Sequence, residues 1–405
     1  MAGHAARTTL KRPWSEHETL DIDEDCVSKV RGRRVHNGDW YPLGPQNLSE
    51  VLHIVEDQVR ALLEACDLRC PAARENLEDF ARRDMVITSS YSGAGTFEVA
   101  VSMYMTTLCE QLGLPSESRG KVSMYAAWGI STASQQVLRS HRLETRPRHL
   151  FGDLTERLEG SDRDRLAAIL SDCMEKYQIG RRQFEDGFLT LQGKKDLRVA
   201  LGRKLVLELS SELESMEFKT TAWCLMCNSQ CPISPRWDPE FKGTYWCEAA
   251  GTNCQPFSTA NHDARGWLDE STLIALVWVY SMRYFQPDTI LRECVVGASM
   301  APFEGPLAAS DVVKCPRSAS VTSDMSDSVF DRSDRDSGKD EGDAYTPDMR
   351  DFSPRQIGLP VERRRRYERY NNAARLQVFP RNDIDFKKVF FRCLACDLSV
   401  FASQA

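Results

Sequence analysis

A short apolar run, a tight glycine turn and a helix follow one another in this chain, and their order restricts the fold more than any other feature. The run Met85-Val86-Ile87 is typical of a buried strand, and Ser89-Ser90-Tyr91-Ser92-Gly93-Ala94-Gly95 follows it as a turn. The residue pattern then predicts a helix over residues 96–108. Strand, glycine turn and helix form the opening unit of a doubly wound α/β sheet.

The rest of the chain continues this alternation of strands and helices. Further strands are expected over residues 122–127, 149–153, 245–250 and 289–296, and further helices over residues 48–68, 134–140 and 273–285. Two charged helical stretches, residues 163–177 and 195–216, have no obvious place in a minimal sheet and are interpreted as an insertion. We therefore predict an α/β fold with a Rossmann-like sheet, a helical insertion and a disordered acidic insert.

Shifts in composition divide the chain into five predicted parts. A flexible tail precedes a helical lead-in and the α/β domain, which carries the helical, cysteine-containing insertion. An acidic Ser/Asp-rich low-complexity insert then separates this domain from its C-terminal part. The predicted bounds are residues 1–45, 46–84, 85–297 with the insertion at 156–222, 298–352 and 353–405.

The net charge of −7 hides a strong asymmetry along the chain. Arginines cluster at residues 31–34 and 363–366, whereas much of the acidity lies in residues 318–352. The acidic balance therefore argues only weakly against a polyanionic partner. Because no apolar run is long enough to cross a bilayer and the N-terminus lacks the apolar segment of a signal peptide, we expect an intracellular protein without a membrane partner.

The glycine turn is a candidate cofactor site, formed by Tyr91, Ser92, Gly93, Ala94, Gly95 and Thr96. Gly93 and Gly95 let the backbone turn sharply and approach a ligand, and the following helix offers N–H groups to an anionic end. The turn lacks the third glycine of a dinucleotide fingerprint, which disfavours a pyrophosphate ligand. A purely structural turn is the alternative interpretation.

Three further positions are expected at the same edge of the sheet. Asp153 follows the third predicted strand and is placed to accept hydrogen bonds from a ligand, with a helix cap as the alternative. Cys254 and Glu293 lie at the ends of two later strands. A thiolate adds to an electron-poor ring carbon and needs a nearby acid to protonate the ring nitrogen. For Cys254, the alternative is a small buried residue near a strand end.

Arginines 363–366 are candidates to lower the pKa of the Cys254 thiol and to bind a ring carbonyl, with a solvated basic strand face as the alternative.

The 14 irregularly spaced cysteines indicate thiols, metal ligands or a catalytic group rather than a disulfide framework. Cys224, Cys227 and Cys231 have partial metal-ligand spacing, and Cys247 is the candidate fourth thiolate. Free thiols are the default interpretation, so no metal ligand is assigned.

Five motifs, taken in order, resemble those of the cytosine-C5 DNA methyltransferase family. They are Tyr91-Ser92-Gly93-Ala94-Gly95-Thr96-Phe97-Glu98, Phe151-Gly152-Asp153-Leu154, Asn253-Cys254-Gln255-Pro256-Phe257-Ser258, Arg292-Glu293-Cys294-Val295 and Gly358-Leu359-Pro360-Val361-Glu362-Arg363-Arg364-Arg365. The family's counterparts are Phe-Ser-Gly-x-Gly-Gly-Phe-Glu, Gly-Asp-Ile, Pro-Cys-Gln-Pro-Phe-Ser, Glu-Asn-Val and Gly-x-Pro-Gln-x-Arg-x-Arg. The similar region spans roughly residues 85–367.

The resemblance implies S-adenosylmethionine as the cofactor, bound by the glycine turn, with Asp153 meeting its adenine. Trp128 is the candidate for packing against that adenine, with core packing as the alternative. The resemblance also implies that Cys254 attacks C6 of a cytosine rotated out of the DNA duplex and that Glu293 binds the ring at N3 and the exocyclic amine. Arg363 and Arg365 are then expected to hold the base and the loop that carries Cys254.

The chain departs from the family's pattern at several points. Asn253 replaces a proline, which removes a φ restriction and is expected to loosen the loop, and Cys294 replaces an asparagine that braces it. Val361 stands in place of a glutamine, and residues 126–129 lack the acid that binds ribose. Few residues follow the arginine motif, so target recognition is expected to be weak or supplied by a partner protein.

The interpretation is therefore a DNA (cytosine-5-)-methyltransferase, which places the protein in the nucleus if DNA is its substrate and otherwise leaves nucleus or cytoplasm open. A degenerate module that binds cofactor or nucleic acid without catalysis is one alternative. The same chemistry on RNA is another, because the cytosine ring is the same in both nucleic acids.

Overall fold

A seven-stranded sheet forms the centre of the computed structural model, in the order β3-β2-β1-β6-β7-β9-β8. The structure describes residues 48–69, 71–187, 190–253, 255–257, 265–295, 345–352 and 365–372, all of them in the unit Tyr41–Ala405. The strands are β1 (Met85–Ser90), β2 (Val122–Trp128), β3 (His149–Phe151), β6 (Tyr245–Gly251), β7 (Thr289–Val295), β8 (Tyr345–Phe352) and β9 (Arg365–Asn372). β1, β2, β3, β6 and β7 run parallel, whereas β9 is antiparallel to both β7 and β8.

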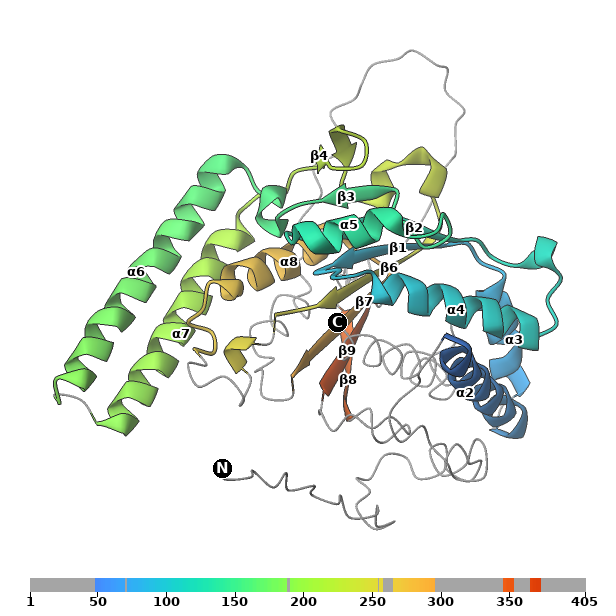
Figure 1. The fold of residues 1–405 in the computed structure, drawn as a ribbon, viewed down its shortest axis with the longest axis horizontal. Helices are drawn as coiled ribbons and strands as arrows, with labels where there is room; N and C mark the ends of the chain where they lie inside the picture. The colour runs from blue at the N-terminus through green and yellow to red at the C-terminus, as the bar shows by residue number, and fades with distance from the viewer. Residues whose placement is uncertain are drawn as a thin grey trace, which may run out of the picture. The chain divides into compact units, whose positions relative to one another are not determined.

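Helices cover both faces of this sheet (Figure 1). They are α2 (Leu48–Arg69), α3 (Pro71–Ala81), α4 (Thr96–Gln111), α5 (Thr132–Ser140), α6 (Gly160–Glu185), α7 (Leu191–Glu214) and α8 (Ser271–Phe285). A two-stranded hairpin, β4 (Thr221–Cys224) and β5 (Ser229–Pro232), forms a second small sheet. Short 3-10 helices connect the elements: η1 (Ser116–Ser118), η2 (Leu154–Arg157), η3 (Pro235–Trp237), η4 (Pro239–Phe241) and η5 (Gln255–Phe257).

Alternation along the strands divides the core into two apolar clusters. Met85 and Ile87 of β1 belong to the cluster formed with α2, α3 and α4, whereas Val86 belongs to the cluster formed with α6, α7 and α8. This is the two-residue period of a strand, and burial of all six β1 residues is typical of a parallel strand that is covered on both faces. The chain therefore folds as a three-layer α/β structure of the Rossmann-like kind.

The strands and helices expected from the sequence are present, with small shifts at their ends. β1 extends to Ser90, so the turn begins two residues later than predicted, and β3 ends at Phe151 instead of continuing to residue 153. The charged stretches interpreted as an insertion form α6 and α7, and Leu205 and Leu209 of α7 are fully buried in the cluster with α8. These helices are therefore part of one outer layer of the domain.

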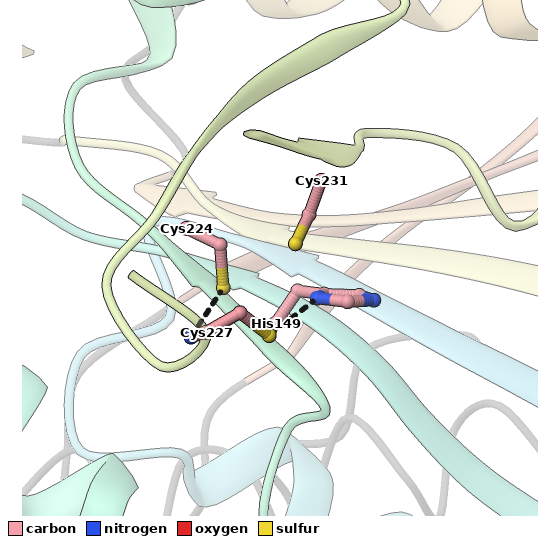
Figure 2. Close-up of side chains that lie close together, drawn as sticks. All are labelled: His149, Cys224, Cys227 and Cys231. Atoms are coloured by element: carbon pink, nitrogen blue, oxygen red, sulfur yellow. Dashed lines mark hydrogen bonds between the residues drawn. The ribbon is translucent and has the colours of Figure 1, made fainter. Parts of the chain in front are cut away.

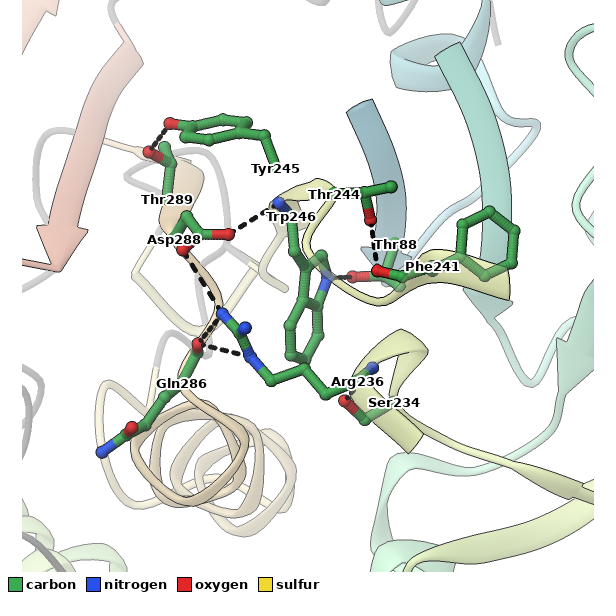
Figure 3. A network of polar contacts seen from close by, with 10 residues as sticks. All are labelled: Thr88, Ser234, Arg236, Phe241, Thr244, Tyr245, Trp246, Gln286, Asp288 and Thr289. Carbon is green, nitrogen blue, oxygen red and sulfur yellow. Dashed lines mark hydrogen bonds and ion pairs between the residues drawn. The ribbon is translucent and has the colours of Figure 1, made fainter. Parts of the chain in front are cut away.

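A polar network ties β6 to β7 at their amino ends (Figure 3). Arg236 donates to the carbonyl oxygen of Gln286 at 2.7 Å and forms an ion pair with Asp288 at 3.3 Å. The second carboxylate oxygen of Asp288 accepts from the backbone N–H of Trp246 at 2.8 Å. This network lies at the opposite ends of the strands from the glycine turn, so we interpret it as structural.

Among the helices that the structure describes, none combines the length and the apolar character needed to cross a membrane. The predicted tail over residues 1–45 and most of the predicted acidic insert, up to residue 344, lie outside the described residues.

Candidate functional site

The carboxyl ends of the parallel strands meet at one edge of the sheet, and four sequence-predicted segments follow or end there. The turn beginning at Tyr91 follows β1, Asp153 comes two residues after β3, and Thr252 follows β6. Glu293 lies near the end of β7. From β1 the chain adds β2 and β3 on one side of the sheet, and it then adds β6 and β7 on the other side. The edge between β1 and β6 therefore contains a topological switch point, the place at which open α/β sheets commonly bind ligands.

The glycine turn holds three residues with positive φ: Tyr91 at 58°, Gly93 at 54° and Gly95 at 80°. A Cβ at Gly95 would lie 2.3 Å from Cε1 of His141, whose Nε2 is hydrogen-bonded to the carbonyl oxygen of Ala94 at 2.9 Å. Position 95 therefore favours glycine for two reasons: the backbone has a positive φ, and the His141 ring leaves no room for a Cβ. A Cβ at Gly93 would meet no atom within 4 Å, so this exposed position borders open space.

Helix α4 begins directly after this turn, and its N-cap Gly95 supplies no side-chain cap. The backbone N–H of Ser92 donates to the carbonyl oxygen of Trp128 at 3.0 Å, which fixes the turn against the end of β2. Glu98 in the first helical turn is buried and accepts a hydrogen bond from the Ser89 hydroxyl. Burial raises the pKa of Glu98, which favours its neutral form.

A buried polar network lies behind the glycine turn and was not foreseen from the sequence. Glu248 of β6 accepts hydrogen bonds from the hydroxyls of Thr88 and Ser90 and from the Trp278 indole, the last at 3.0 Å. Arg157 donates to Ser90 Oγ at 3.1 Å. Ser90 is the last residue of β1, and its hydroxyl thus connects the buried Glu248 side chain to the buried Arg157 guanidinium.

Trp128 does not offer its side chain to a ligand, contrary to that prediction. Its indole is only 1% exposed, stacks on Phe151 with ring centroids 4.5 Å apart, and lies 4.5 Å from the Arg157 guanidinium carbon. The core-packing alternative is therefore correct for this side chain. Two residues later, Ile130 is 69% exposed and presents the apolar surface at this end of β2.

Asp153 has the helix-cap role that the sequence offered as its alternative. Its Oδ1 accepts from the backbone N–H of Thr155 at 2.8 Å and caps helix η2. Its side chain remains partly exposed, and a carboxylate has a second oxygen with its own acceptor sites. The cap therefore orients Asp153 without using up its capacity to accept hydrogen bonds.

The segment leading to Cys254 is tied to β7. Gly251 pairs with Glu293 in the parallel register, and a Cβ on Gly251 would lie 4.0 Å from both the Glu293 Oε2 and the Tyr91 carbonyl oxygen. The buried Arg292 donates from Nε to the Thr252 hydroxyl at 3.1 Å. This contact braces the loop from the position just before Glu293.

Asn253 also restrains this loop, although the sequence led us to expect loosening. Its Oδ1 accepts from the backbone N–H of Gln255 at 3.1 Å, directly before helix η5. An Asx turn of this kind limits the backbone by a hydrogen bond where a proline limits it by its ring. Cys254 itself lies outside the described residues, and so do residues 258–264.

The arginine motif is described in part. Arg365 begins β9 and pairs with Val295 of β7, two residues beyond the position of Glu293. The antiparallel strand thus returns the backbone of a distant segment to the end of β7. Arg363 lies outside the described residues.

The three clustered cysteines have a histidine, not Cys247, beside them. Side-chain ligand atoms of His149, Cys224, Cys227 and Cys231 all lie within 4.8 Å of one another. Cys247 is 2% exposed in the cluster beneath α4, and burial raises the pKa of its thiol. The prediction of Cys247 as a fourth ligand is therefore wrong, because its strand buries it in the other core cluster.

The fold and this edge define an α/β protein with a mostly parallel, Rossmann-like sheet and a topological switch point. Comparison with models of known protein families gives no match, and no curated protein sequence matches the chain. The resemblance to cytosine-C5 methyltransferases thus rests on the five sequence motifs.

Proposed function

We propose that this protein transfers a methyl group from S-adenosylmethionine to C5 of cytosine in DNA through a covalent adduct at Cys254. The proposal is supported mainly by one arrangement: the register pairs Gly251, three residues before Cys254, with Glu293, next to the backbone of Tyr91. The antiparallel strand adds Arg365 beside Val295. Residues from three of the five motifs, separated by up to 274 positions between 91 and 365, therefore meet at the ends of adjacent strands, together with Gly251, which lies two residues before the Cys254 motif.

The chain's own residues fit an adenosyl group at the switch point. Gly93 borders open space, and the N-terminus of α4 has no side-chain cap, so both are suited to receive a charged group. Asp153 would accept from an adenine amine, and the exposed Ile130 would cover the apolar ring in the role first considered for Trp128. S-adenosylmethionine, when bound, supplies an electrophilic methyl group.

The remaining groups would act on the base. The Cys254 thiolate adds to C6, and Glu293 binds N3 and favours its protonation, so that electron density moves to C5. C5 then takes the methyl group. Loss of the C5 proton to a base and departure of the thiolate restore the aromatic ring and the enzyme. The hydrogen bond between Arg292 and Thr252 would keep the nucleophile's loop beside Glu293 during these steps.

The decisive test is incubation of the full chain with S-adenosylmethionine and a DNA oligonucleotide that contains 5-fluorocytosine. Fluorine blocks removal of the C5 substituent, so a covalent protein–DNA adduct that maps to Cys254 is expected. The Cys254→Ser variant should give no adduct while it binds cofactor almost as the wild type does. A buried thiol elsewhere provides the matched control: Cys109→Ala should still form the adduct.

The alternatives predict different outcomes in the same assay. A chain that binds cofactor but never traps DNA would contradict the proposal and favour a non-catalytic module that binds cofactor or nucleic acid. Trapping of a 5-fluorocytosine RNA in place of the DNA would move the same chemistry to RNA. Methyl transfer by Cys254→Ser at the wild-type rate would overturn the assignment of the nucleophile.

A further inference from the structure

One imidazole and three thiols gather at the outer edge of the sheet (Figure 2). His149 comes from β3, whereas Cys224, Cys227 and Cys231 come from the β4–β5 hairpin. Their ligand atoms all lie within 4.8 Å of one another, and the Cys227 sulfur lies 3.6 Å from Nδ1 of His149. His149 and Cys224 are separated by 75 positions in the sequence, so folding alone creates this cluster.

The hairpin presents its sulfur atoms in an ordered way. Ala222 pairs with Cys231 across the two strands, and the turn between them contains Asn228 at a positive φ of 53°. The backbone N–H of Cys227 points to the Cys224 sulfur at 3.4 Å. The backbone N–H of Leu225 donates to the Leu150 carbonyl oxygen at 2.7 Å, which attaches the turn to β3 next to His149.

We propose that His149, Cys224, Cys227 and Cys231 bind one structural zinc ion. Tetrahedral zinc with bonds of about 2.3 Å to sulfur and about 2.0 Å to nitrogen places ligand atoms about 3.5–3.8 Å apart. The observed sulfur–nitrogen distance of 3.6 Å is in this range, and the bound of 4.8 Å leaves only a small contraction. Three thiolates and one imidazole are a set that zinc prefers in structural sites.

The surroundings also fit a closed structural site rather than a set of unrelated thiols. Cys224 is fully buried, while His149 is 6% exposed and Cys231 is 7% exposed. The His149 ring is packed edge-on against Tyr125, with ring centroids 5.0 Å apart. Disulfide pairing would leave one of the three sulfur atoms and the imidazole without a role, whereas one metal ion uses all four groups.

The zinc ion would hold the hairpin to the edge strand of the main sheet. β3 has only three residues, and its far end leads to Asp153 after two more. A second link comes from Arg139 of α5, which donates to the Leu225 carbonyl oxygen at 3.0 Å. The ion would thus fix the short strand that leads to Asp153, in a role separate from catalysis.

The test begins with metal analysis of the full chain purified without chelator. About one zinc ion per chain is expected. Replacement of zinc by Co²⁺ should give the visible absorption of tetrahedral cobalt together with sulfur-to-cobalt charge-transfer bands. Mapping of alkylated cysteines should show Cys227 protected despite its exposure, and reactive after the metal is removed.

Variants separate this site from the other thiols. His149→Ala and Cys231→Ala should lose the bound zinc on dialysis against a competing chelator, whereas His149→Cys, which restores four ligands, should keep it. Cys247→Ala is the matched control and should keep about one zinc ion per chain. Absence of stoichiometric zinc from the wild type, iron in its place, or a disulfide within the cluster would overturn the proposal, even if a variant fails to fold.

Discussion

Replacing Arg157 by methionine should destabilise the whole domain strongly, because its charge is buried in the polar network behind the glycine turn. The side chain is 1% exposed, and its guanidinium donates to Ser281 Oγ at 2.7 Å and to Ser90 Oγ at 3.1 Å. Burial lowers the pKa of Arg157 to about 10, so it is still a cation at neutral pH. The same Ser90 hydroxyl donates to the buried Glu248.

The size of the effect follows from what methionine leaves behind. Methionine fills much of the volume but donates no hydrogen bond, so the buried Glu248 loses its neighbouring positive charge. Removal of one partner from a buried charge pair typically costs about 3–5 kcal/mol. For a domain of this size each kcal/mol lowers the melting temperature by roughly 2–4 °C, so a decrease of about 10 °C is expected.

Thermal and urea unfolding, followed by circular dichroism at neutral pH, measure this loss. The matched control is Arg82→Met, because Arg82 is exposed, and its effect should stay within about 0.5 kcal/mol. Adding Glu248→Gln to Arg157→Met should recover part of the loss, since it removes the stranded negative charge. An Arg157→Met variant as stable as Arg82→Met would refute the view that this arginine stabilises a buried acid.

Two further substitutions test the turn that precedes α4 and the first turn of that helix. Gly95→Ala should destabilise more than Gly113→Ala, which also has a positive φ but open space at its Cβ, because alanine at position 95 would collide with His141; unfolding free energies of the two variants provide the comparison. Glu98→Gln should flatten part of the pH dependence of stability: burial raises the pKa of Glu98 in the folded state, so the folded protein binds the proton more tightly and wild-type stability falls as pH rises above the ordinary value of 4.5. Urea unfolding of wild type and Glu98→Gln between pH 4 and pH 8 checks this sign, and a wild type that gains stability over this window through Glu98 would contradict it.

Local patterns in the sequence were sufficient for most elements of the fold. The apolar run from Met85 and the glycines at 93 and 95 predicted β1, its turn and α4, because strand alternation and positive φ depend on neighbouring residues. The order of strands and helices then predicted a doubly wound sheet. The charged residues of α6 and α7 led us to interpret these helices as an insertion. Those charges belong to the solvent-facing side, whereas Leu205 and Leu209 on the other side are buried in the core.

The residues of the candidate functional site were also only partly predictable from the sequence. Gly93, Asp153 and Glu293 could be chosen from the sequence because each follows or ends a strand, and parallel strands bring such ends to one edge. Trp128 was misjudged, because a residue at a strand end can point into the core or out of it. Only the packing of Phe151 and Arg157 against its ring decides between the two.

The sequence by itself determined the α/β class, the element that begins the sheet and the motifs placed at its edge, because these depend on residue type and on short spacing. Tertiary structure alone decided which distant residues meet: Ser90 with Arg157 and Glu248, and His149 with the cysteines of the hairpin. No local spacing encodes these contacts, since strand order and register bring together segments that the chain keeps far apart.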